Sequence, residues 1–239
     1  MAKMIKTKLL KRTVDSKLLF NNINLSIPNN KITGLLGANG AGKTSLFRAI
    51  AGLSDVDSGE LTFFDNDLKN MSLEERASRG LNYVPQENSL FEDLTLLENL
   101  LAVVELKFGF ISSEKNEESK LLLDKMNLLE KKDIKAKNLS GGEKRKTEIL
   151  RAILLESKFI LLDEPFAGVD PISVEEINKI LKELKKNVGI FLSDHNFRDV
   201  INVCDLIILL NQGEVLVQGT PKEVKNNPIA KKFYFGELN

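Results

Sequence analysis

The sequence is short of cysteine and has no excess of charge of either sign, and each shortage excludes a class of protein. Cys204 is the single cysteine among 239 residues, so no internal disulfide can form, and a reduced, cytoplasmic compartment is expected. Lys and Arg together number 34, and so do Asp and Glu, which gives a formal charge of zero. Because a dedicated nucleic-acid-binding protein carries a basic excess, we expect no nucleic-acid partner.

Long apolar segments are also missing. A membrane-spanning helix needs about 20 consecutive apolar residues, and the longest runs here, at 159–162 and 206–210, are far shorter. Residues 1–10 contain lysines but no apolar stretch of the signal-peptide type. We therefore expect no direct membrane span, and a membrane process served by this chain would take its membrane part from another polypeptide.

What is present predicts a folded α/β protein. Hydrophobic residues make up 42% of the chain, enough to bury a core. Segments rich in β-branched or alternating apolar residues predict strands, and capping residues followed by helical periodicity predict helices. The predicted strands are 4–10, 23–27, 31–36, 59–64, 81–84, 159–162, 189–192, 205–210 and 214–218. The predicted helices are 43–51, 72–80, 95–106, 114–129, 143–155 and 174–186, with a further helix start at Thr220.

One stretch of the chain differs from the rest. Residues 87–137 contain no convincing strand, whereas strands and helices alternate on both sides of them. Such alternation predicts a parallel sheet covered by helices. We predict one domain, 1–239, in which a helical subdomain, 87–137, is inserted into an α/β core made of residues 1–86 and 138–239.

A glycine-rich segment after the third predicted strand fits the phosphate-loop pattern G-x-x-x-x-G-K-[ST]. Glycines let backbone N–H groups turn toward phosphate oxygens, and the following helix presents its positive N-terminus to the same anion. Lys43 adds a charge for the β- and γ-phosphates, and the Thr44 hydroxyl can bind Mg²⁺. An ordinary glycine turn, the alternative, would not need a strand before it and a helix after it. The predicted ATP-binding residues are Gly37, Ala38, Asn39, Gly40, Ala41, Gly42, Lys43, Thr44 and Ser45.

The predicted strand 159–162 is continuously apolar and is followed by two carboxylates, Asp163 and Glu164. A buried parallel strand delivers such side chains to the carboxyl edge of its sheet. Asp163 is placed to hold Mg²⁺, and Glu164 to activate an attacking water. Solvated acids at a strand end are the alternative, which the upstream phosphate loop disfavours.

The third segment is Leu139-Ser140-Gly141-Gly142-Glu143, at the start of a predicted helix. Ser140 and Glu143 have the spacing of a capping box, but capping does not need two glycines. The glycines allow close backbone approach, so that Ser140 and two N–H groups can bind an anion at the helix start. The chain therefore has a second phosphate-binding device but only one phosphate loop, which indicates that two chains share nucleotides.

In this order and spacing, the three segments resemble the ATPase subunits of ATP-binding cassette (ABC) transporters, over essentially the whole chain. The resemblance implies a P-loop NTPase core of the RecA type with a mixed sheet, N-terminal antiparallel strands and an inserted helical subdomain. It also implies hydrolysis of ATP with Mg²⁺, membrane subunits supplied by other chains, and a position on the cytoplasmic face of the inner membrane. In the implied homodimer two ATPs are sandwiched, and the signature of one protomer closes each site of the other. The signature residues are Leu139, Ser140, Gly141, Gly142 and Glu143.

Further roles follow from the resemblance. Gln86, after the strand 81–84, matches a glutamine that touches Mg²⁺ or the attacking water. Asp170 lies in the loop that organises the dimer interface. His195, the only histidine in the chain, matches the switch histidine that contacts the γ-phosphate. The implied catalytic residues are Glu164, His195, Gln86 and Lys43, and the implied metal-binding residues are Thr44, Gln86 and Asp163.

One feature of the family is missing. Its members stack an aromatic ring on adenine, and Val14 stands at the matching position. Val14 can cover one face of the base but has no aromatic quadrupole, so we expect GTP to compete with ATP more effectively than in relatives. Phe91, shortly after Gln86, is the predicted floor of a groove for a short helix of the membrane subunit. The alternative places Phe91 in the core of the helical subdomain.

Segments outside the shared motifs indicate which substrate the transporter would carry. Residues 163–174, 193–196 with Arg198, 219–221 and 233–237 are similar to lipopolysaccharide-export ATPases, which predicts that cargo. ATPases of branched-chain amino acid importers are the alternative within the family, and a non-transport P-loop ATPase is the alternative outside it. A phosphoryl-transfer kinase would have no use for Ser140 or for the Asp163–Glu164 pair.

Overall fold

The computed structural model describes residues 4–235, so the resemblance noted at 236 and 237 lies outside the described residues. Within that range the strands form two sheets. The first contains β1 (Met4–Val14), β2 (Lys17–Pro28), β4 (Ser58–Phe63) and β5 (Asn66–Asp67), in the order β2-β1-β4-β5. The second contains β3 (Ile32–Leu36), β6 (Leu81–Val84), β7 (Phe159–Asp163), β8 (Gly189–Asp194), β9 (Leu206–Asn211) and β10 (Glu214–Gly219).

The second sheet is mostly parallel. Its order is β10-β9-β3-β8-β7-β6, and all neighbours are parallel except β10, which returns antiparallel to β9. The return is made at Gln212 and Gly213, which both have positive φ, as a tight hairpin turn requires. Strands β3, β7 and β8 are buried at every residue, because both faces of the sheet are covered. The predicted mixed sheet with N-terminal antiparallel strands is confirmed.

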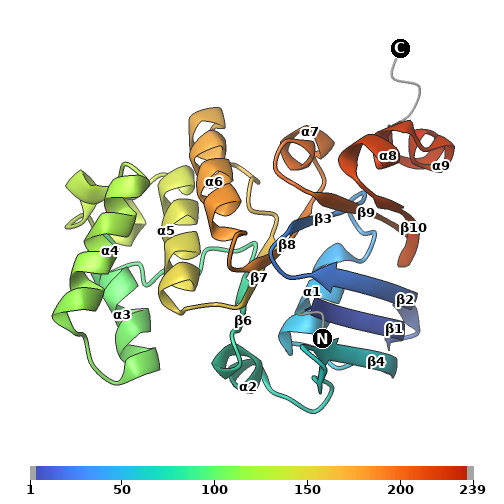
Figure 1. Cartoon of the computed structure of the whole chain (residues 1–239), viewed down its shortest axis with the longest axis horizontal. Helices are drawn as coiled ribbons and strands as arrows, with labels where there is room; N and C mark the ends of the chain where they lie inside the picture. The colour runs from blue at the N-terminus through green and yellow to red at the C-terminus, as the bar shows by residue number, and fades with distance from the viewer. Residues whose placement is uncertain (1–3, 236–239) are drawn as a thin grey trace.

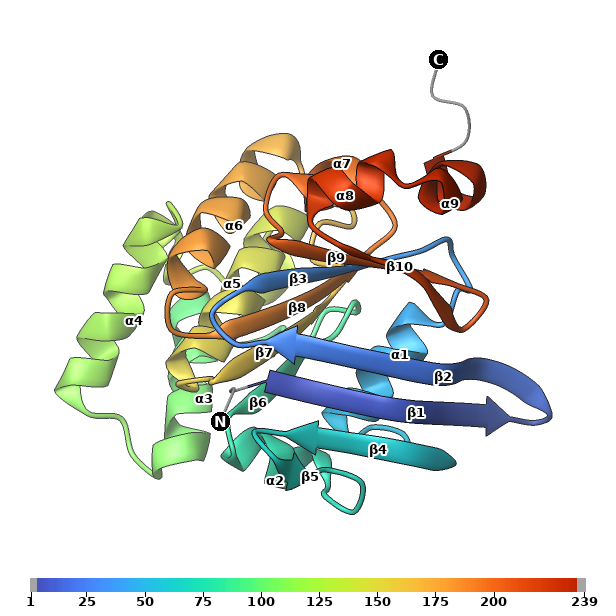
Figure 2. The same cartoon turned by 45° about the vertical axis from the view of Figure 1, so that its right-hand side comes forward.

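One helix fills the space between the two sheets. α1 (Lys43–Ala51) buries its apolar face in a cluster that also contains residues of β1, β2, β7 and β8. Phe47 of α1 stacks on Phe191 of β8 with ring centroids 4.6 Å apart. Figure 2 shows α1 behind the antiparallel strands β1 and β2. This packing fixes the N-terminus of α1, and the phosphate loop that precedes it, at the carboxyl end of β3.

The other long helices lie beyond the opposite face of the parallel strands, on the left of Figure 1. α5 (Gly141–Leu154) packs against β6, α6 (Pro171–Leu184), α3 (Leu96–Phe108) and α4 (Ser113–Lys125). A single apolar cluster joins these helices to the sheet. The shorter elements are α2 (Leu73–Ser78), α7 (Phe197–Ile201), α8 (Pro221–Asn226), α9 (Pro228–Ala230), a π-helical turn at Lys231–Phe235, and 3-10 turns at Leu129–Lys131 and Ala136–Asn138.

The predicted helices are all present, but several of their boundaries are wrong, among them the start predicted at 143, which lies at Gly141. Capping boxes form at Ser72, Thr95, Ser140 and Thr220, as predicted. The helix predicted to begin at 174 begins at Pro171, because the Asp170 side chain accepts hydrogen bonds from the first free N–H groups. The strand predicted to end at residue 10 continues to residue 14, through register shifts that its pairing with β2 absorbs. Residues 87–137, all of them described, contain helices and no named strand, while their separation as a subdomain stays a prediction.

None of the helices formed by residues 4–235 has the length and apolar character needed to cross a bilayer.

Candidate active site

The phosphate loop runs from the end of β3 to the start of α1. Gly40 and Gly42 have φ values of 80° and 103°, the left-handed region that favours glycine. At Gly37 a Cβ would lie 2.4 Å from the Leu210 carbonyl oxygen, so this position admits only glycine without a backbone shift. The loop therefore has the backbone geometry of an anion cradle at a helix N-terminus.

Lys43 lies inside this loop. Its ammonium donates hydrogen bonds to the carbonyl oxygens of Gly37 and Ala38, at 2.8 and 3.2 Å. Burial lowers the pKa of Lys43, and the neighbouring carboxylates of Glu164, Asp194 and Asp163 oppose this shift. The loop thus holds a cation, surrounded by acidic groups, at the place where phosphate charge would be neutralised.

Asp163 is fully buried at the end of β7 and gathers hydroxyl groups around its carboxylate. Ser193 donates to Oδ1, Tyr83 donates to Oδ2 at 3.1 Å, and the Thr44 hydroxyl lies 3.4 Å from Oδ1. Burial and the charge of Asp163 raise the pKa of Tyr83, so its phenol stays a donor. Carboxylate and hydroxyl oxygens of this kind fit Mg²⁺, which usually takes one or two protein carboxylates beside waters and phosphates. Thr44 and Asp163 are therefore residues that could hold the metal, and a role of Gln86 as a further ligand stays a prediction.

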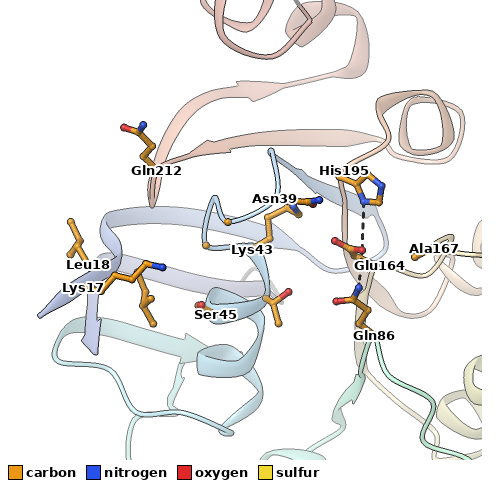
Figure 3. Close-up of a pocket in the computed structure, with 14 residues that line it drawn as sticks. Lys17, Leu18, Asn39, Lys43, Ser45, Gln86, Glu164, Ala167, His195 and Gln212 are labelled. Atoms are coloured by element: carbon orange, nitrogen blue, oxygen red, sulfur yellow. Dashed lines mark hydrogen bonds and ion pairs between the residues drawn. The ribbon is translucent and has the colours of Figure 1, made fainter. Parts of the chain in front are cut away.

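Glu164 follows Asp163 in a strained backbone conformation, with φ of 45°. Its N–H donates to the Ser193 carbonyl at 3.1 Å, and its side chain is only 10% exposed. Gln86 Nε2 donates to Glu164 Oε2 at 3.1 Å, and His195 Nδ1 lies 3.5 Å from the same oxygen. Figure 3 shows the three side chains in a row, with Glu164 in the middle. The structure thus brings together residues that follow β6, β7 and β8.

A pocket of about 790 Å³ joins the phosphate loop to this row, within the size range of small-molecule sites. Three groups of residues that sequence reasoning missed also line it: a segment of β2, the β9–β10 turn and a residue after Glu164. The lining residues are Lys17, Leu18, Leu19, Asn39, Gly40, Gly42, Lys43, Thr44, Ser45, Gln86, Glu164, Ala167, His195 and Gln212. Gly37, Ala38, Ala41 and Asp163 are not among the lining residues. Lys17, Leu18, Leu19 and Gln212, which no motif marks, reach the pocket because β2 and the β9–β10 turn lie against the phosphate loop.

The end of the pocket beside β2 is aliphatic and polar. Val14 is 39% exposed on the β1–β2 hairpin and is not among the lining residues, whereas Lys17 and Leu18 of the next strand are. Among the residues that the structure describes, those that line the pocket include no Phe, Tyr or Trp, and the only ring is the imidazole of His195 beside Glu164. Contact between Val14 and a base stays a prediction, and Leu18 is the nearer apolar side chain to the pocket.

The signature segment lies outside this pocket. Ser140 is exposed and caps α5, with its hydroxyl accepting from the Glu143 N–H at 3.3 Å. A Cβ on Gly142 would lie 2.6 Å from Ser173 Oγ and 2.9 Å from Asp170 Oδ2. Asp170 in turn caps α6. The signature and the Asp170 loop therefore pack on each other within one chain, an internal reason for the second glycine that the sequence alone did not reveal.

α5 also holds the backbone immediately before Gln86 and Glu164. Arg145, buried on this helix, donates to the carbonyl oxygens of Pro85 and Asp163, at 2.7 and 2.6 Å. Its neighbour Glu148 accepts from the Ser89 N–H at 2.6 Å. These bonds tie the segment around Gln86 and the end of β7 to the signature helix. The only sequence signal for them is the presence of paired charges on the buried face of an amphipathic helix.

Phe91 lies at the edge of a second, shallower hollow of about 320 Å³, whose other lining residues are Leu94, Ala102, Glu105 and Leu106. The Phe91 ring is 44% exposed and lies 5.1 Å from the Arg151 guanidinium. Its backbone is held by Asn99, which accepts from the Phe91 N–H at 2.9 Å. The structure therefore places Phe91 in a groove rather than in the core, and what binds there stays a prediction.

Comparisons with known proteins agree with this geometry. Residues 20–167 match the family model described as ABC transporter. The chain is 40% identical over 229 residues to the lipopolysaccharide export system ATP-binding protein LptB of Haemophilus influenzae, covering 95% of each chain. It is 37% identical to the protein of the same name from Escherichia coli K12, covering 96% of each. A crystal structure of the ADP conformation of an ATP-binding cassette of an ABC transporter superposes with a TM-score of 0.88, at 27% identity and covering 99% of this chain and 100% of the other.

Proposed function

Because the chain belongs to the ABC transporter family as an ATP-hydrolysing subunit, we propose that it powers lipopolysaccharide export as a homodimer bound to membrane subunits. The observation that carries the catalytic part is the row of Gln86, Glu164 and His195 beside the phosphate loop, with Glu164 Oε2 3.1 Å from one neighbour and 3.5 Å from the other. The row meets the loop at one pocket.

Nucleotide binding is the first role of the site. The phosphates enter the loop between β3 and α1, where backbone N–H groups and the helix N-terminus attract negative charge. Lys43 exchanges its two carbonyl partners for phosphate oxygens, which its lowered pKa does not prevent, because the phosphate charge favours the ammonium form. Thr44 and Asp163 would hold Mg²⁺, which would supply positive charge to neutralise the phosphates.

Hydrolysis is the second role. Glu164 accepts a proton from the attacking water, and Gln86 orients that water through the amide already bonded to Glu164. His195 and Lys43 stabilise charge on the transferred phosphoryl oxygens. The strained backbone of Glu164 is consistent with this role, because such conformations cluster at functional sites.

The homodimer completes each site in this proposal. Ser140 and Gly141 are exposed and do not line the pocket of their own chain. A second protomer can place them over the γ-phosphate, and closure then excludes water from the site. The packing of Gly142 on Asp170 and Ser173 lets the signature and the Asp170 loop move as one surface.

The partner and cargo are the finer part of the proposal. A short helix of the membrane subunit fits the groove beside Phe91, which has an apolar floor and an acidic rim at Glu105. This places the chain on the cytoplasmic face of the inner membrane. Lipopolysaccharide is supported by the names of relatives that match nearly the full chain. A branched-chain amino acid importer is the competing assignment.

The test uses Glu164→Gln in the full chain, which keeps the shape of the side chain but removes the base. We expect it to bind ATP, to lose turnover by about 1,000-fold, and to accumulate as a dimer only when ATP is present. Sizing with ATP and with ADP measures the dimer. The Glu164→Gln variant, purified from cells, should retain the membrane subunits of a lipopolysaccharide exporter.

Two results would contradict parts of the proposal separately. A Glu164→Gln variant that turns over at the wild-type rate removes the catalytic assignment. Retention of the membrane subunits of an amino acid importer leaves the ATPase intact and removes the cargo.

A further inference from the structure

The C-terminal segment of the described chain reaches back to the catalytic row. Val224 of α8 and Ala230 of α9 are fully buried and anchor this segment against the sheet. The π-helical turn at Lys231–Phe235 follows, and such turns are rare and frequently occur at functional sites. From this turn the Tyr234 hydroxyl donates a hydrogen bond of 2.5 Å to the main-chain carbonyl of His195, 39 residues earlier in the sequence.

The same histidine is held from its other side by Asp194. Asp194 Oδ1 accepts hydrogen bonds from the N–H groups of His195 and Asn196, at 2.7 and 2.8 Å. The Asp194 side chain is buried at the end of β8, so its position is fixed by the sheet. Both main-chain polar groups of His195 therefore have partners that belong to rigid parts of the molecule.

The imidazole, in contrast, is free to approach a ligand. The His195 side chain is 48% exposed, and its Nδ1 lies 3.5 Å from Glu164 Oε2 and 3.6 Å from Asp194 Oδ1. Because few contacts hold the exposed imidazole itself, its direction depends mainly on the position of the His195 backbone. Its reach toward a phosphate oxygen depends on where the loop after β8 is held.

Tyr234 is suited to hold that loop. Burial and the negative charge of Asp194 raise the pKa of Tyr234 to about 12. The phenol is therefore protonated and remains a donor throughout the neutral range. The neighbouring Phe233 faces solvent, with 56% of its surface exposed, so the turn directs one aromatic residue inward and one outward.

On the basis of the hydrolysis proposed above, we propose that Tyr234 is a positioning residue for His195. By bonding the His195 carbonyl, the C-terminal segment holds the loop after β8 so that the imidazole meets the γ-phosphate in the transition state. Tyr234 touches neither nucleotide nor water in this scheme. It affects the rate of hydrolysis and leaves the binding of ATP to the phosphate loop unchanged.

The test is a double-mutant cycle in the full chain, with Tyr234→Phe and His195→Ala singly and together. Tyr234→Phe keeps the ring and removes only the hydroxyl. We expect kcat to fall about 5-fold, the effect of losing one neutral hydrogen bond, while KM and the affinity for a fluorescent ATP analogue stay within about 2-fold. In the His195→Ala background the same substitution should cause no further loss, because the group that it positions is gone. Phe233→Ser, at the exposed neighbour, is the matched control and should keep the wild-type rate.

The outcomes separate this proposal from the one it rests on. A Tyr234→Phe variant with wild-type kcat overturns the positioning role, and so does an equal loss of rate in both backgrounds, since that would reflect a general structural effect. A His195→Ala variant with the full rate overturns the catalytic role of His195 itself. Thermal melting of each variant verifies that the fold is retained in every comparison.

Discussion

The two anion-binding devices of this chain differ in how completely a single copy builds them. The phosphate loop is preassembled, because Lys43 is 5% exposed and bonded to carbonyls of its own loop. In the signature Ser140 and Gly141 are exposed, and within residues 4–235 the side chains of Ser140 and Glu143 form a capping box and an ion pair of Glu143 with Lys131. The phosphate loop can bind phosphate without a change of structure, whereas the signature can bind only a phosphate that a second protomer presents to it. The asymmetry is what a site divided between two protomers requires.

A similar contrast exists between the residues that hold Asp163 and those that hold the loop of His195. Asp163 is surrounded by hydroxyl donors inside the sheet, while His195 lies on a loop that elements from outside the parallel sheet help to hold. The carboxylate proposed to hold the metal is thus fixed inside the sheet, whereas the imidazole proposed to meet the γ-phosphate is 48% exposed. Substitutions that disrupt the phosphate loop and the signature separately test whether the two segments act independently.

Replacement of the buried lysine has the largest expected effect on binding. Lys43→Ala removes the charge at the centre of the preassembled device, and we expect ATP affinity to fall about 100-fold or more. Isothermal titration with ATP measures the change. Lys17→Ala, at the pocket rim, is the control and should lower affinity far less. Equal losses for the two variants would show that the cradle is not centred on Lys43.

The signature glycines give a sharper test of the exposed device. In Gly142→Ala the new methyl meets Ser173 and Asp170 at 2.6 and 2.9 Å, so the tip must shift. We expect ATP hydrolysis to fall about 100-fold, as misplaced catalytic parts do, with ATP affinity unchanged. Gly141→Ala has its nearest neighbour, the Gly168 carbonyl, at 3.4 Å and should fold without this shift. If Gly142→Ala weakens ATP binding as much as hydrolysis, the two devices are not independent.

The groove beside Phe91 should matter for assembly and not for chemistry. Phe91→Ala removes the exposed aromatic wall of the groove, and we expect affinity for the membrane subunits to fall about 10-fold. ATP binding by the isolated chain should not change. Leu121→Ala, another exposed apolar residue of the helical region, is the control for a general loss of surface area. Complex formation by Phe91→Ala at the wild-type level would remove the groove from the proposal.

Base selectivity has the smallest expected effect. Since the residues lining the described pocket include no Phe, Tyr or Trp, we expect GTP to compete with ATP within about 3-fold, because stacking contributes only modestly to affinity. Val14→Tyr should increase the preference for ATP if Val14 faces the base, and Leu18→Ala tests the neighbouring strand. Strict selection of ATP by the wild-type chain would contradict this expectation.

Much of this molecule was predictable because its chemistry is local. The phosphate loop needs closely spaced glycines and a lysine, and the carboxylate pair directly follows an apolar strand, so both are visible in the sequence. The four capping boxes follow from residues three positions apart. The positions of Gln86 and His195 followed from resemblance, and the structure then placed both beside Glu164.

The sequence by itself determined which residues can bind phosphate and where helices begin, because those properties depend on neighbours along the chain. Only the tertiary structure decided that Tyr83 and Ser193 surround Asp163, that Gly142 faces Asp170, and that the C-terminal turn holds the His195 loop. These contacts join segments far apart in sequence. Their existence depends on strand order and helix packing, which local patterns do not specify.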